Sequence, residues 1–179
     1  MKFVHRGAHA VTRVDLAALI LRLALGGMIC MHGYAHVWRG GKIAGTARWF
    51  KSIGMRPPLV QAWMASITEM GSGALLILGL VTPLAAAGLI GVMTVAFVVE
   101  HRTKGFFIYN PGQGWEYVAV IAASALALGT LGGGRFSLDR AFDIEITRKW
   151  GGLLICIVAG FGGAALQLAA SWRPLKKDG

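Results

Sequence analysis

Six ionisable side chains stand within or beside apolar stretches of this sequence of 179 residues. Such groups cost roughly 2.5 to 3.5 kcal/mol each at membrane depth, so they are expected to face the interior of a helix bundle and to find partners there. Histidine and glutamate together can pass protons between water and a bound ligand. The candidate ligand-binding set is therefore Arg22, His32, His36, Glu69, His101 and Glu116, and the candidates for a proton relay within it are His32, His101 and Glu116.

The spacing of His32 and His36 places both imidazoles on one side of a helix, a geometry that can bind a metal ion or haem. Two ligands do not define a site, and no motif as specific as H-E-x-x-H accompanies them. The alternative is a pair of interfacial histidines that hydrogen-bond to Glu116 or to water. We therefore assign no metal ligands.

Five apolar segments carry these side chains. Apolar residues make up 55% of the chain and charged residues only 15%, whereas about a quarter of the residues of a soluble domain are charged. A helix of roughly 20 residues crosses the ~30 Å of bilayer hydrocarbon. We predict an all-α membrane protein, with a four-helix antiparallel transmembrane bundle and a fifth, C-terminal transmembrane helix, from the apolar segments 14–38, 57–81, 83–99, 115–131 and 151–171.

The polar segments between these spans divide the chain into five regions. We expect a basic N-terminal segment (1–13), a four-helix core (14–140) with an interfacial amphipathic loop (39–56), a charged linker (141–149), an additional helix (150–172) and a basic tail (173–179). The net charge is +10, and its Lys and Arg residues lie mostly between apolar segments, where they meet anionic headgroups. We therefore predict contact with membrane lipids and no nucleic-acid binding.

Small residues spaced four apart in the last span, Ala159/Gly163 and Gly160/Ala164, allow close helix packing. Packing within the chain is favoured over a homo-oligomer contact through this fifth helix, which stays the alternative.

Arg22 and Glu69 lie at similar expected depths, about 22 and 16 Å from the same membrane face. A guanidinium can hold a carboxylate with two hydrogen bonds, so we predict that these two side chains form an ion pair between the first and second spans. The inward-facing stripe of the first span is then Arg22, Gly26, Ile29, Gly33 and His36.

Several short motifs follow one another in a fixed order along the first four spans. They are Leu21-Arg22 with Gly26, His32-Gly33, Pro57-Pro58, Glu69-Met70-Gly71, Leu78-Gly79-Leu80, His101, Gly114-Trp115-Glu116-Tyr117 and Gly134-Arg135-Phe136-Ser137-Leu138-Asp139. In this order the chain resembles the DoxX family of small bacterial membrane proteins over about residues 14–140. The resemblance implies a four-helix core in the bacterial inner membrane, a multi-pass protein, and functional positions at Arg22, His32, Glu69, His101 and Glu116.

The family often has lysine where His36 stands, which favours a hydrogen-bond donor over a metal ligand there, and the fifth span lies beyond the usual core. Members are associated with membrane redox chemistry, including subunits that look like parts of thiosulfate:quinone oxidoreductase and complexes linked to oxidative-stress defence. The resemblance therefore implies a membrane subunit of a quinone-linked redox complex or an oxidative-stress system.

A quinone is the favoured cofactor, and haem or a metal ion is less favoured. The sequence has no flavin, nicotinamide or cluster motif, so the electrons would come from a redox partner protein. The alternative function is a non-catalytic membrane scaffold, or a carrier of a lipid or other hydrophobic ligand, that assembles partner proteins. A transporter is less favoured, because the spans show no inverted repeat.

Overall fold

The computed structural model describes residues 10–146 and 149–174, and the only strand-like pairing in this part of the chain is an isolated bridge between Met55 and Trp172. The elements are α1 (Arg13–Trp38), α2 (Lys42–Ser52), α3 (Pro58–Leu78), α4 (Thr82–Ala96), η1 (Phe97–His101), α5 (Glu116–Leu131), α6 (Leu138–Ala141), α7 (Gly151–Ile155), η2 (Cys156–Phe161) and α8 (Gly162–Ser171). The π-helical turn η1 extends α4, and α7, η2 and α8 follow one another without a break. We call these last three elements together the C-terminal helix.

Local sequence explains where the long helices begin and end. Thr12 and Asp15 form a capping box at the start of α1. Pro58 occupies the first turn of α3, where its missing N–H costs nothing, and α3 ends at Gly79 in the left-handed conformation. Gly79 is also required by packing, because a Cβ there would lie 2.5 Å from Cζ of Arg22.

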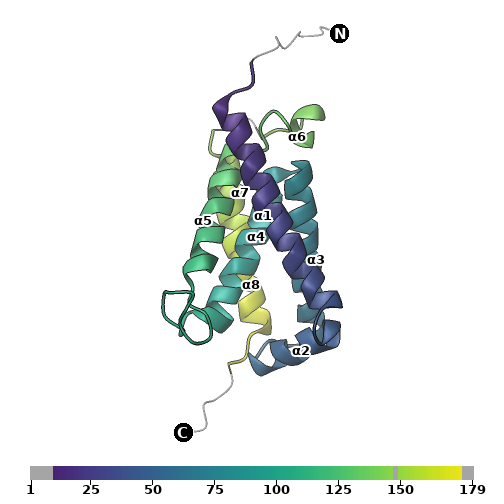
Figure 1. Cartoon of the computed structure of the whole chain (residues 1–179), viewed down its shortest axis with the longest axis vertical. Coiled ribbons are helices and arrows are strands. Elements are labelled where there is room, and N and C mark those ends of the chain that lie inside the picture. The colour runs from purple at the N-terminus through teal and green to yellow at the C-terminus, as the bar shows by residue number, and fades with distance from the viewer. Residues whose placement is uncertain (1–9, 147–148, 175–179) are drawn as a thin grey trace.

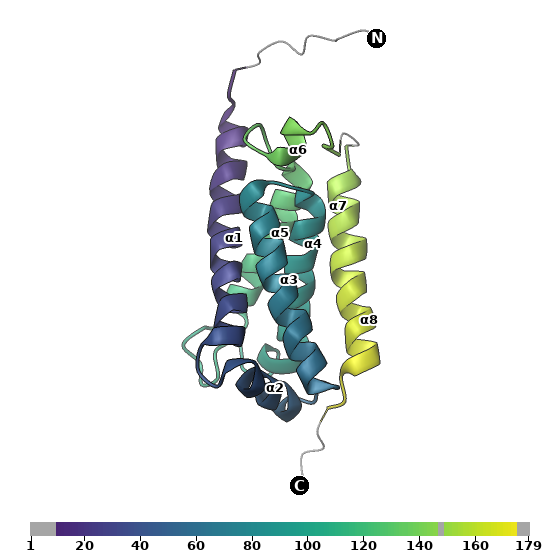
Figure 2. The ribbon, with the colours of Figure 1, turned by 90° about the vertical axis from the view of Figure 1, so that its right-hand side faces the viewer.

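The long helices run along the long axis of the molecule, and α2 lies across one end of it (Figures 1 and 2). We call this end, where η1 and α8 also finish, the α2 end; α6 covers the opposite end (Figure 1). The predicted inward stripe of α1 is confirmed at four of its five positions, which are buried, and His36 is half-buried. The α1 backbone approaches α3 so closely that a Cβ at Gly26 would lie 2.7 Å from the Gly73 carbonyl oxygen.

The C-terminal helix packs beside α4 through small residues. A Cβ at Gly160 would lie 2.9 Å from the Ile90 side chain, and Ala164 is buried. These two residues therefore serve contacts within the chain, as the favoured interpretation of the small-residue spacing predicts.

Three helices are long and apolar enough to cross a membrane: Arg13–Trp38, Thr82–His101 and Gly151–Ser171. The apolar helix α5 is shorter, with 16 residues. α3 has 21 residues but buries polar side chains, among them Gln61, Ser66, Glu69 and Ser72. The chain is therefore an α-helical membrane protein.

The ends of the bundle can be assigned to membrane sides by cysteine labelling. In a Cys30→Ala, Cys156→Ala background, we expect single cysteines at Lys51 and Tyr109 to react with an impermeant maleimide from one side, and a cysteine at Phe142 to react only from the other. All three side chains are exposed, and the first two lie at the α2 end. Labelling of positions 51 and 109 from opposite sides would contradict the arrangement.

Basic residues favour one orientation. The described residues place eight at the α2 end: Arg39, Lys42, Arg48, Lys51, Arg56, Arg102, Lys104 and Arg173. They place four at the other end: Arg13, Arg135, Arg140 and Lys149. Because cytoplasmic loops carry the excess of Lys and Arg, the labelling experiment is expected to find the α2 end on the cytoplasmic side.

Candidate functional site

A cavity of about 290 Å³ lies between α2, α3, α4 and the C-terminal helix. Along α4 and η1 its lining runs from Ala87 to Val99, which is about 18 Å of helix. Glycines on the facing helices leave the space, among them Gly91 on α4 and Gly163 on α8. The walls are mainly apolar, as in most small-molecule sites, and the volume is just below their usual range of about 300–1,000 Å³.

One wall of this cavity carries a histidine and a glutamate. Nε2 of His36 lies 3.4 Å from Oε2 of Glu69, whose side chain is only 6% exposed. Among the described residues no donor is aligned well enough to hydrogen-bond to this oxygen. The His36 ring is nearly parallel to the indole of Trp49, with ring centres 6.3 Å apart. The cavity therefore contains a buried carboxylate oxygen with unused acceptor capacity beside an imidazole, and such a group calls for an explanation.

The opposite wall carries an amide that the sequence argument missed. Gln167 lines the cavity and donates from Nε2 to Oε1 of Gln61 at 2.8 Å, and Gln61 donates to Oγ of Ser171 at 3.0 Å. The indole of Trp172 donates to the Ile53 carbonyl oxygen at 3.0 Å. These bonds fasten the C-terminal helix to α3 and to the turn after α2. The sequence signal that could have identified Gln167 is that it is the one side-chain amide in the apolar segment 151–171.

The predicted ion pair between Arg22 and Glu69 is wrong. The Arg22 side chain is buried, and it donates to four carbonyl oxygens at 2.7–2.9 Å: those of Leu76, Ile77, Gly133 and Phe136. Two of these carbonyls belong to the last turn of α3, where backbone acceptors lack helical partners and the helix dipole favours a cation. Arg22 therefore caps α3 and joins it to the segment after α5.

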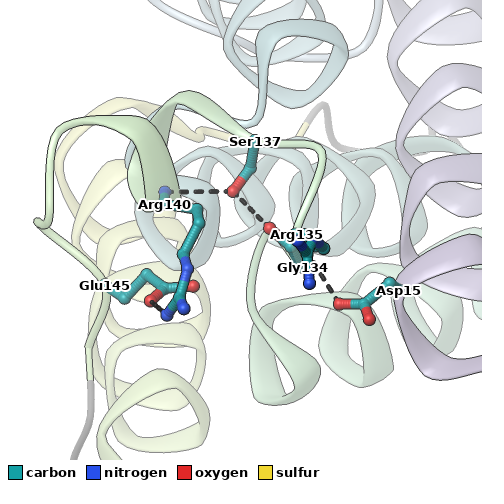
Figure 3. A network of polar contacts seen from close by, with 6 residues as sticks. All are labelled: Asp15, Gly134, Arg135, Ser137, Arg140 and Glu145. Atoms are coloured by element: carbon teal, nitrogen blue, oxygen red, sulfur yellow. Dashed lines mark hydrogen bonds and ion pairs between the residues drawn. The ribbon is translucent and has the colours of Figure 1, made fainter. Parts of the chain in front are cut away.

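A polar network holds that segment in place over the end of the bundle (Figure 3). The Arg135 amide donates to Asp15, and Oγ of Ser137 donates to the Gly134 carbonyl and accepts from the Arg140 amide. The Arg140 guanidinium donates to Glu145 at 2.9 Å, a bond that also raises the pKa of Arg140. This network positions the carbonyls that receive Arg22.

Asp139 adds a second link at the same end. Its carboxylate accepts from the backbone amides of Val81 and Thr82 at 2.6 and 2.9 Å, two of the free donors at the start of α4. The 132–146 segment therefore acts as a cap for both α3 and α4.

His101 lies outside the cavity lining, and both of its ring nitrogens are engaged. Nδ1 is 3.0 Å from the Gln113 carbonyl oxygen, which can only accept, so Nδ1 carries the hydrogen. Nε2 lies 2.7 Å from the Tyr117 hydroxyl oxygen, within hydrogen-bond distance. His101 therefore joins the end of η1 to the start of α5 and to the loop before it.

We expect His101→Ala to lower the thermal midpoint of the purified protein, because the part-buried hydrogen bonds to the Tyr117 hydroxyl and the Gln113 carbonyl are lost, at about 0.5–1.5 kcal/mol for each bond. Ligand affinity should not change. Differential scanning fluorimetry in detergent measures the first effect and a ligand titration the second. His32→Ala is the control and should alter neither. A selective loss of ligand affinity in His101→Ala would restore His101 as a contact residue.

The remaining two candidates, His32 and Glu116, do not line the cavity. His32 is exposed on α1, and Glu116 is half-buried in the first turn of α5, where a carboxylate is favoured by the helix dipole. Among the described residues, no three His, Cys, Asp or Glu side chains gather closely enough to hold a metal ion. The structure therefore brings together His36 and Glu69 from the predicted set, with Trp49 and Gln167 as additional residues.

Comparison with known proteins identifies the first half of the chain. Residues 17–102 match the model of the DoxX family. Searches of curated proteins and of solved structures give no match. The matched residues include Arg22, His36 and Glu69, whereas Gln167 and the C-terminal helix lie outside them. Residues 17–102, which reach from the first turns of α1 to the residue after η1, are therefore a DoxX domain.

Proposed function

We propose that this chain is a multi-pass protein of the bacterial inner membrane, with five spans, that binds a quinone in the cavity beside α4. It serves as the membrane subunit of a quinone-linked redox complex or an oxidative-stress system. The observation that carries the proposal is the Glu69 carboxylate oxygen, which is buried at an apolar cavity without a hydrogen bond. An evolved site retains such a group when a ligand supplies its partner.

The side chains around the cavity suit the polar groups of a quinone. A quinone carbonyl oxygen accepts hydrogen bonds, and both the His36 imidazole and the Gln167 amide can donate. A quinol hydroxyl donates, and the free oxygen of Glu69 can accept. The apolar walls and the Trp49 indole suit the flat ring. The same residues suit haem or a metal ion less well, because among the described lining residues only His36 and Glu69 are of the His, Cys, Asp or Glu types, and Met64 adds a single thioether.

The redox step itself requires a partner. Reduction of a quinone to its quinol takes up two electrons and two protons. The electrons would come from a redox partner protein, because the sequence has no motif for a flavin, nicotinamide or cluster. The protons would reach the ring oxygens through His36 and Glu69, whose carboxylate and imidazole are 3.4 Å apart.

The proposal is tested by titrating the purified protein with decylubiquinone and recording tryptophan fluorescence. Saturable quenching is expected, because Trp49 lines the cavity. In Trp49→Phe the quenching should shrink while binding, measured by isothermal calorimetry, persists. Mass spectrometry of a mild-detergent extract should also find a co-purified quinone. Quenching that rises linearly without saturation would overturn the proposal.

A carrier or scaffold is the second candidate. The observation that favours it is the exposed run Phe106, Phe107, Ile108 and Tyr109 in the loop before α5, since exposed aromatic residues are frequent at contact surfaces. A scaffold predicts that Phe107→Ser disrupts recovery of a partner protein from native membranes while quinone binding is unaffected.

A further inference from the structure

The cavity has a mouth on the side of the bundle. Of its lining residues, Trp49 on α2, Met64 on α3, and Ala159 and Gly163 on the C-terminal helix are also exposed on the surface. Met64 retains 44% of its accessible area. These two helices flank α4, whose residues form the cavity floor (Figure 2). One opening therefore lies between α3 and the C-terminal helix, the two helices that carry three of these four residues.

The depth of this mouth can be counted along the helices. Met64 is six residues from the start of α3, and Gly163 and Ala159 are eight and twelve residues from the end of α8. At 1.5 Å per residue, the mouth is about 9–18 Å inside the α2 end. Since the hydrocarbon core is about 30 Å thick, an opening at this depth faces lipid chains.

At the α2 end, polar side chains join α3 to the C-terminal helix. There the Gln167, Gln61 and Ser171 side chains are hydrogen-bonded to one another across the two helices. The Trp172 indole is bonded to the turn after α2, and the Arg102 guanidinium lies 5.1 Å from the centre of the Trp172 ring. This clasp closes the gap between α3 and the C-terminal helix on the side of the headgroups.

We propose that the mouth between Met64 and Gly163 is a lateral portal, through which a membrane-dissolved quinone with a long isoprenoid tail enters from the hydrocarbon. The inference rests on the proposed function and adds the entry route and the ligand class. The ring moves to His36 and Glu69, and the tail stays in the portal and the lipid, because a cavity of about 290 Å³ has room for a ring and only a short part of a tail.

The glycine at the portal provides the test. A Cβ at Gly163 would meet no atom within 4 Å, and the same holds for its neighbour Gly162, which does not line the cavity. Gly163→Leu therefore narrows the portal, and Gly162→Leu is a matched control with the same added side chain on the same helix. Equal thermal midpoints of the two variants would show that both fold.

Stopped-flow fluorescence with ubiquinone-10 in phosphatidylcholine vesicles is expected to show association slowed about tenfold or more in Gly163→Leu, with dissociation slowed as well, because both directions pass the same constriction. Gly162→Leu should behave as the wild type. A second probe, a ubiquinone with a photoreactive diazirine on its tail, should label Met64 and residues 159–163.

Two outcomes overturn different claims. If the wild type binds ubiquinone-10 saturably but Gly163→Leu associates at the wild-type rate, or the tail labels the loop 102–115, the portal is wrong and the proposed function stands. If the wild type shows no saturable binding of either probe, the proposed function fails and the portal fails with it.

Discussion

Replacing Arg22 with methionine is expected to abolish the recovery of folded protein. Methionine fills a similar length but donates no hydrogen bond, so the carbonyls of Ile77, Gly133 and Phe136 lose the donor that Arg22 gives them. Each buried acceptor left without its donor costs about 1–3 kcal/mol, so the three together are a large share of a total stability of about 5–15 kcal/mol. Fluorescence-detected size-exclusion chromatography of a tagged protein should show an aggregate in place of the monodisperse peak.

Two companion variants identify the cause. Arg22→Lys retains a charge and up to three donors but lacks the planar fork, so partial recovery is expected. Arg22→Lys combined with Glu69→Gln should shift the thermal midpoint by the sum of the single effects, because the two side chains do not pair. A non-additive double variant would reinstate the ion pair, and a stable Arg22→Met would show that the α3 carbonyls find other donors.

The helices themselves could be predicted from the sequence, because a span is a local property of length and apolarity. The predicted segment 14–38 corresponds to α1 (Arg13–Trp38), and the predicted segment 115–131 corresponds to α5 (Glu116–Leu131). The interfacial amphipathic piece became α2. The short helix α6 was not predicted, since its four residues carry no apolar period and depend on Ser137 capping the turn.

The error over Arg22 and Glu69 arose from helix register. Depths counted from loop ends placed the two side chains about 6 Å apart along the membrane normal. The glycine contacts instead pair Gly26 with Gly73 and Gly33 with Ser66, which sets Glu69 opposite the region of Cys30, about 12 Å from Arg22 along α1. Register between transmembrane helices is fixed by close backbone contacts, and these are not visible in one sequence.

The sequence alone could single out two polar residues of the candidate site, but it could not show which helices enclose the cavity. His36 and Glu69 stood out because charge is rare in apolar segments. Gln167 is separated from them by about a hundred residues, and only the packing of the C-terminal helix beside α4 makes it a cavity residue. Conversely, His101 has a similar sequence signal to His36, but its two ring nitrogens are already satisfied.

Glu69→Gln is expected to weaken quinone binding while leaving the fold as stable as before, or more stable. Gln has the shape of Glu without its charge, so it removes the energetic cost of a buried carboxylate oxygen that has no hydrogen bond. A residue that destabilises the free protein and improves ligand binding is the pattern expected of a functional site. Structural and functional roles for Glu69 therefore predict opposite signs of stability change.

The size of the binding effect follows from the charge that is lost. The Gln amide oxygen still accepts a hydrogen bond, but a bond to a neutral group contributes about 0.5–1.5 kcal/mol, against about 1.5–3 kcal/mol for a bond to a charged group. Decylubiquinol, whose hydroxyl would donate to Glu69, should therefore bind about tenfold more weakly to Glu69→Gln. The affinity for the oxidised quinone should change less, since its carbonyls only accept. Glu116→Gln, the same substitution at a half-buried glutamate outside the cavity, should leave quinol affinity unchanged and lower stability by about 0.3–1 kcal/mol, which its charge contributes at the start of α5. If Glu69→Gln unfolds the protein or leaves quinol affinity unchanged, Glu69 is a structural group and the cavity is not a quinol site.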